Sequence, residues 1–142
     1  VPSGQSVAAH NLIRLSRLTG ESSLENRAKD LLDSLASSAA AAPTAFTWLL
    51  AAADYLADGG TDVVLAEGEG LSELLAQFKG FYPYTTRSVC GKDYPGLSDI
   101  ASFTRHMAPQ EGKAAAYLCK NGSCVKPVTQ KDQLKELLNY QV

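Results

Sequence analysis

The hydrophobic positions of residues 1–58 recur at the spacing of amphipathic helices. Ser3 is a suitable N-cap for a first helix that runs to about Thr19, and Gly20 is a suitable end for it. A second helix is expected from Ser22, with Glu25 completing a capping box. The apolar positions of these two helices are Val7, Ala8, Leu12, Leu15 and Leu18, followed by Leu24, Ala28, Leu31 and Leu35.

The third helical stretch, residues 43–58, is apolar on nearly every side. Pro43 falls near its first turn, where proline is tolerated. Trp48, Leu50 and Tyr55 point to different sides of this helix, so we expect it to be buried on most of them. Three helices cannot cover so much apolar surface alone. The pattern therefore favours αα-hairpins from a larger helical array, and it predicts self-association or packing onto the second half.

The pattern changes after Asp58-Gly59-Gly60. Residues 61–66 read as a β-branched strand, 71–79 as a helix and 82–89 as a second strand, which together predict a parallel crossover. A short helix near 98–105, a hairpin of 113–119 with 124–128, and a last helix capped by Thr129 complete the order β-α-β-(α)-β-β-α. We therefore predict an α+β chain, with a helical segment at 1–58 and a small α/β segment at 61–142.

Composition narrows the functional classes. The 142 residues are 45% hydrophobic. The chain has 13 basic and 15 acidic residues and a net charge of −2, and this balance argues against nucleic-acid binding. No stretch approaches the roughly 18 apolar residues of a membrane span. The chain lacks an initiator methionine and a signal sequence, and it enters a helix at once. This beginning predicts a piece cut from a longer protein, and three cysteines, too few for a disulfide framework, favour a cytoplasmic location.

Cys119 and Cys124 flank Asn121-Gly122, which is the strongest short-range signal of a type I′ hairpin. This turn would make the cysteines a non-hydrogen-bonded pair with Cα atoms about 4.5–5.5 Å apart. A cytosolic location favours two reduced thiols that pack as small hydrophobic groups, and a cross-strand disulfide is the main alternative. A metal site is disfavoured, because the spacing is not one of zinc ligands. No sequence motif indicates a cofactor.

Several stretches carry a resemblance to a known family. PSGQSVAAHNLIRLSRLTG, TDVVLAEG and GKAAAYLCKNGSCVKPVTQKDQLKELL resemble the end of YyaL-family proteins, the thioredoxin-domain-containing proteins that include spermatogenesis-associated protein 20. The family usually has Asn where this chain has Gln5. The resemblance implies a thioredoxin-like domain, a helical toroid similar to six-hairpin glycosidases and epimerases, and a closing α/β segment. This chain would hold the last helices of an incomplete αα-toroid and that closing segment.

The resemblance implies partners and a first functional hypothesis. The full-length protein would bind or act on a sugar, with the thioredoxin-like domain and the rest of the toroid as partners, whereas this piece would be inactive alone. Whether the parent is an enzyme stays open. Ser3, Gly4 and Gln5 at a helix start, and Asn11 within the apolar arc, are candidate ligand contacts, although Ser3 is also explained as a cap.

Two other hypotheses stand beside the sugar-active one. Cys119 and Cys124 could form a redox module that works with the missing thioredoxin-like domain, or the chain could be a non-catalytic assembly module. Catalytic residues cannot be assigned from spacing alone. His10 shares a helical stripe with Arg14 and Arg17, so we expect a solvated side chain rather than a catalytic one.

Overall fold

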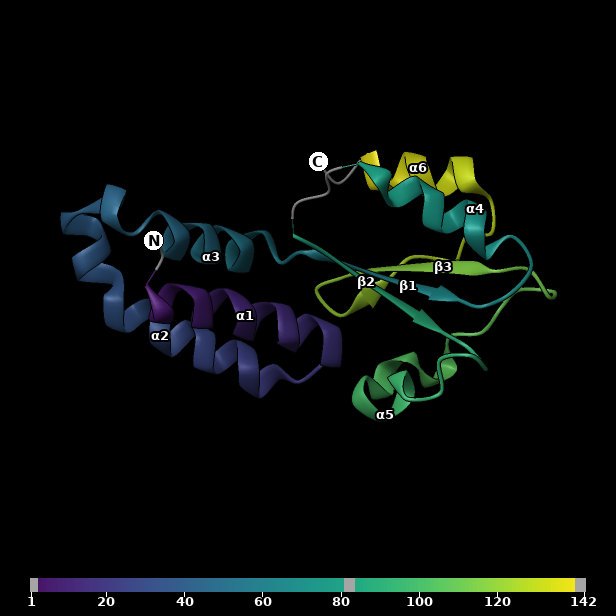
Figure 1. Cartoon of the computed structure of the whole chain (residues 1–142), viewed down its shortest axis with the longest axis horizontal. Coiled ribbons are helices and arrows are strands. Elements are labelled where there is room, and N and C mark those ends of the chain that lie inside the picture. Colours follow the sequence, from purple (N-terminus) through teal and green to yellow (C-terminus); the bar gives the residue numbers. More distant parts are fainter. Residues whose placement is uncertain (1–2, 81–83, 140–142) are drawn as a thin grey trace. The chain divides into compact units, whose positions relative to one another are not determined.

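The computed structural model describes residues 3–80 and 84–139, and the chain forms two compact units, Val1–Gly59 and Gly60–Val142 (Figure 1). The first unit is helical and the second is α/β. The predicted α+β class is confirmed. The two units are described separately.

The first unit consists of α1 (Gly4–Thr19), α2 (Ser22–Ala41), the short 3-10 turn η1 (Pro43–Ala45) and α3 (Thr47–Asp58). Ser3 caps α1 as predicted, since its hydroxyl accepts a hydrogen bond from the Ser6 N–H at 3.1 Å. Gly20 ends the helix in the left-handed conformation, with φ of 76°.

The predicted capping box of the second helix is wrong. The N-cap of α2 is Glu21, whose side chain makes no capping hydrogen bond. Glu25 pairs instead with Lys29 at 2.8 Å and with Arg17 of α1 at 3.4 Å. Glu25 therefore forms an ion pair between α2 and α1. The start of α2 has no side-chain cap.

The core of the first unit is built largely from small side chains, which let the helices approach closely. The expectation that α3 is buried on most sides is wrong. It packs mainly on α1, and Trp48 and Leu50 remain 44% and 43% exposed. Two neighbouring helices cover only part of its apolar surface. The buried hydrophobic residues of the unit are Ala9, Ile13, Ala28, Ala39, Leu49, Ala52 and Tyr55.

The second unit is built on a four-stranded sheet with the order β2-β1-β3-β4. The central strand β1 pairs in parallel with β2 and antiparallel with β3, and β3 forms an antiparallel hairpin with β4. The predicted parallel crossover and element order are confirmed. The strands are β1 (Thr61–Ala66), β2 (Thr85–Cys90), β3 (Ala115–Lys120) and β4 (Ser123–Cys124).

Two predicted strands have different bounds in the structure. The second strand was expected over 82–89, but β2 spans Thr85–Cys90, and residues 82–83 lie outside the described part of the chain. The last strand was expected over 124–128, but β4 ends at Cys124. Beyond it, only an isolated bridge between Ala116 and Val128 continues the pairing.

One face of the sheet is covered by α4 (Leu71–Leu75), the 3-10 turn η2 (Ala76–Lys79) and α6 (Lys131–Asn139), as Figure 1 shows. Strand alternation sends every second side chain of β1 and β3 to this face. The resulting core contains Val63, Leu65, Leu74, Phe78, Ala114, Ala116, Leu118, Leu134 and Leu138.

The opposite face carries a smaller cluster under α5 (Leu97–Ile100) and the 3-10 turn η3 (Ser102–His106) (Figure 1). Phe103 and Met107 pack onto Val64 and its neighbours there. The Tyr117 hydroxyl donates a hydrogen bond to the Ala108 carbonyl at 2.8 Å and so fixes the connection that follows η3. The apolar cluster under α5 and η3 is therefore smaller than the core under α4, η2 and α6.

Replacing a core leucine should test this packing. Leu118→Ala, at a side chain 1% exposed between α6, α4 and the sheet, should lower the free energy of unfolding by about 2–5 kcal/mol. Leu75→Ala is the matched control, because Leu75 is 44% exposed and should lose less than about 1 kcal/mol. Urea unfolding followed by circular dichroism measures both. Equal losses in the two variants would contradict the assigned core.

Candidate functional site

The hairpin turn fixes the register of the two cysteines. Asn121 and Gly122 both have positive φ, 53° and 77°, as a two-residue type I′ turn requires. Lys120 lies opposite Ser123, and Cys119 lies opposite Cys124. The predicted turn and pairing are therefore confirmed.

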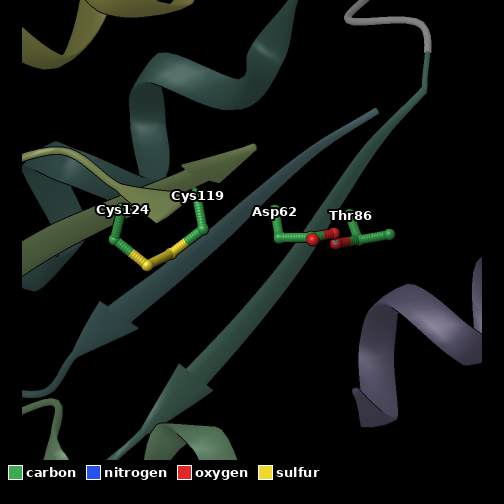
Figure 2. The surroundings of a disulfide bond; sticks show 4 residues. All are labelled: Asp62, Thr86, Cys119 and Cys124. Atoms are coloured by element: carbon green, nitrogen blue, oxygen red, sulfur yellow. Dashed lines mark hydrogen bonds between the residues drawn. A yellow bond between two sulfur atoms is a disulfide. The ribbon is translucent and has the colours of Figure 1, made fainter. Parts of the chain in front are cut away.

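The structure joins the two cysteines in a disulfide (Figure 2). The favoured interpretation as two reduced packing thiols is thus wrong here, and the alternative holds. Their Cα atoms are 3.9 Å apart, closer than the 4.5–5.5 Å predicted for a non-hydrogen-bonded pair. The hairpin brings the thiols together without help from distant parts of the chain.

The two ends of the disulfide differ in accessibility. Cys119 lies on β3 and is 6% exposed, whereas Cys124 lies on the edge strand β4 and is exposed. A reagent in solution therefore reaches Cys124 more readily than Cys119. In thiol–disulfide exchange, access to a sulfur helps to decide which of the two is attacked and which becomes the leaving group.

A carboxylate and a hydroxyl lie next to the disulfide on the two neighbouring strands of the sheet. Asp62 of β1 is directly opposite Cys119, and Thr86 of β2 is the parallel partner of Asp62. The Thr86 hydroxyl donates a hydrogen bond to Asp62 Oδ1 at 2.5 Å. Figure 2 shows the four side chains in sequence, and we call Cys124, Cys119, Asp62 and Thr86 the disulfide row.

The disulfide row occupies one end of its sheet face. Asp62 and Thr86 lie near the amino ends of β1 and β2, whereas the apolar cluster of Ala66 and Cys90 lies at their carboxyl ends. This face is therefore polar at one end and packed at the other.

The third cysteine does not belong to the disulfide row. Cys90 is buried in the apolar cluster, and its thiol donates a hydrogen bond to the Met107 carbonyl at 3.5 Å. Burial raises the pKa of the Cys90 thiol, which makes it a poor nucleophile. Among the described residues, no group of three or more His, Cys, Asp or Glu side chains is arranged to hold a metal ion.

The candidate ligand contacts of the first unit are not gathered into a site. Gly4 and Gln5 are exposed in the first turn of α1, and the Ser3 hydroxyl is engaged in capping. Asn11 was expected within the apolar arc but is exposed. The buried side of α1 is formed instead by Ser6, Ala9, Ile13 and Ser16, whereas Val7 and Leu15 of the expected apolar arc are exposed.

His10 is not the solvated side chain that its helical stripe predicted. Its ring is half-buried, with its centroid 5.5 Å from that of Trp48 and 5.7 Å from that of Tyr55 on α3. Burial, and then the nearby Arg14 charge, lower the pKa of His10. The sequence missed this because it depends on the packing of α1 against α3.

Sequence reasoning also missed Asp62 and Thr86. Their place beside the cysteines depends on the pairing of β1 with both β3 and β2, which is not visible in local patterns. One signal was available, since an acidic residue is uncommon inside a buried β-branched strand.

No family model, curated protein or solved structure matches the chain. The resemblance to the YyaL family therefore stays a prediction. None of the described helices combines the length and the apolar character that crossing a bilayer requires.

The lowered pKa of His10 predicts a pH dependence of stability. The unfolded chain takes up a proton near the ordinary histidine pKa of about 6.5, whereas the folded state resists protonation to lower pH. The contribution of His10 is thus fully present above about pH 6.5 and is lost as the pH falls below it. Urea unfolding between pH 5 and 8, followed by the fluorescence of Trp48, the single tryptophan, measures the slope.

His10→Phe keeps an aromatic ring but cannot titrate, so it should flatten this slope between about pH 5 and 7. His106→Gln is the matched control, because His106 is an exposed histidine on η3 of the second unit. An unchanged slope in His10→Phe would contradict the assignment.

Proposed function

We propose that the α/β unit takes part in thiol–disulfide exchange through the Cys119–Cys124 bond. The observation that supports this proposal is the asymmetry of the bond, which joins an exposed residue, Cys124, to a buried one, Cys119. A disulfide buried at both ends would be shielded from a protein partner. This one presents a single sulfur on an edge strand.

The exchange proceeds in two steps. A thiolate of the partner attacks Cys124 Sγ, the disulfide breaks, and its electron pair goes to Cys119 Sγ, which then takes up a proton. The second thiol of the partner loses its proton and attacks the mixed disulfide, which releases Cys124 as a thiolate that is protonated in turn. The partner dithiol is oxidised to a disulfide, and Cys119–Cys124 is reduced to two thiols.

The partner in this proposal is a protein dithiol. The resemblance to the YyaL family supplies a candidate, the thioredoxin-like domain of the parent chain. The other expectations drawn from sequence stay predictions, namely a sugar-active toroid, self-association and a cytoplasmic location. The contacts of Ser3 and the exposure of Gln5 and Asn11 give no specific support to a sugar site.

The proposal predicts a reversible change at two cysteines together. In glutathione buffers from about −180 to −320 mV, Cys119 and Cys124 should pass from oxidised to reduced in one two-electron transition. Alkylation of the native protein followed by mass spectrometry counts the free thiols at each potential. The buried Cys90 should remain unlabelled throughout and serves as an internal control.

Cys124→Ser provides a second control, because it removes the pair while leaving Cys119 and Cys90 in place. It should show no two-electron transition. A wild-type bond that stays closed, or two thiols that stay open, over the whole range of potentials would refute the exchange function.

A further inference from the structure

We infer that Asp62 controls how fast the Cys119–Cys124 disulfide opens, by opposing the negative charge that develops on Cys119 when the bond is attacked at Cys124. The inference deepens the proposed exchange function and rests on the same disulfide. It assigns to Asp62 a kinetic role that holds for any nucleophile, whether or not a protein partner exists.

The first step of the argument is placement. Asp62 and Cys119 are directly opposite on antiparallel strands, a relation that sets Cβ atoms about 4.5–5.5 Å apart on one sheet face. Figure 2 shows Asp62 between Cys119 and Thr86, with its carboxylate turned toward Thr86. The Thr86 hydroxyl, itself only 5% exposed, holds the carboxylate in this position.

The second step is the direction of attack. Cys124 is the exposed residue of the pair, so the nucleophile attacks its sulfur and the electron pair of the broken bond goes to Cys119. Cys119 is 6% exposed, and water therefore screens its new charge poorly. A carboxylate one strand away raises the energy of this thiolate and makes Cys119 a slower leaving group.

The third step concerns the other charges near the disulfide row. On this face of the four described strands, the remaining titratable side chains are Tyr117 and Cys90, and neither is a carboxylate. Lys120 follows Cys119, but strand alternation sends it to the opposite face. The covering segment, α5 with η3, carries Asp99, Arg105 and His106, all of which are exposed. Asp62 is therefore the carboxylate placed to act on Cys119.

The test measures the opening of the disulfide by a neutral water-soluble phosphine, tris(hydroxypropyl)phosphine. The phosphorus atom attacks Cys124 Sγ and Cys119 leaves as a thiolate. Water then converts the thiophosphonium to phosphine oxide and releases the Cys124 thiol. A neutral reagent avoids direct repulsion between Asp62 and the nucleophile, so only the leaving group senses the charge.

Asp62→Asn should open about three- to tenfold faster than the wild type at pH 7. The ratio of the two rates should fall toward 1 once the solution is acidic enough to protonate Asp62, because the two variants then carry the same charge at this position. The equilibrium against glutathione should change by less than about twofold, because the inferred repulsion acts on the charge that develops while the bond breaks. A loosened strand would instead shift the equilibrium and leave the ratio of rates independent of pH.

Three further variants complete the test. Asp62→Glu keeps the charge and should stay within about twofold of the wild-type rate, as should Thr86→Val, which removes only the hydrogen bond. If Asp62→Asn does not fold, Asp62→Ser replaces it, since its hydroxyl can still bond to Thr86. Circular dichroism establishes the fold of each variant before its rate is measured.

The outcomes separate this inference from the proposed function. A ratio of 1 at every pH, slower opening in Asp62→Asn, or a bond that the phosphine opens in no variant overturns the role of Asp62. A wild-type bond that glutathione leaves closed, but that the phosphine opens with the expected ratio, refutes the exchange function and supports the inference.

Discussion

The α/β unit depends on the double pairing of β1. This strand is hydrogen-bonded on one side to β2 in parallel and on the other to β3 in the antiparallel sense. Four consecutive residues, Val63 to Ala66, are almost completely buried, so both faces of the strand are committed to packing. A shift of one residue in the register of β1 would move each of its side chains to the opposite face of the sheet. Because both faces pack against apolar clusters, such a shift is disfavoured.

The same pairing explains why a charged residue lies inside the sheet. Asp62 comes just before the buried residues of β1. It lies on the same sheet face as the apolar cluster beneath α5 and η3, but at the opposite end of the strand. The Thr86 hydroxyl partly replaces the water that the carboxylate loses there. The strand thus combines a hydrophobic centre with one polar position beside the disulfide.

Much of the fold was predictable from sequence, because its signals are local. Ser3 and Gly20 mark the ends of α1, the β-branched run within Thr61–Ala66 marks β1, and Asn121-Gly122 sets the hairpin and the pairing of its cysteines. The candidate site was only half predictable, since Asp62 and Thr86 join it through pairings between distant segments. Two local predictions failed for the same reason, namely the capping box of Ser22 with Glu25 and the solvated side chain of His10. In both cases a contact between helices outweighed the local preference.

The disulfide closes a very short loop, since the bonded cysteines are separated by five positions around a turn that forms from its own sequence. The chain entropy that a cross-link removes grows with the size of the loop it closes, so this bond restricts the unfolded chain far less than one joining distant segments. The hairpin is also held by backbone pairing and by the Val125 N–H donating to the Leu118 carbonyl. We therefore expect the hairpin to keep its strand pairing when the disulfide is reduced, so that a change in oxidation state would be a local chemical change rather than an unfolding of the unit.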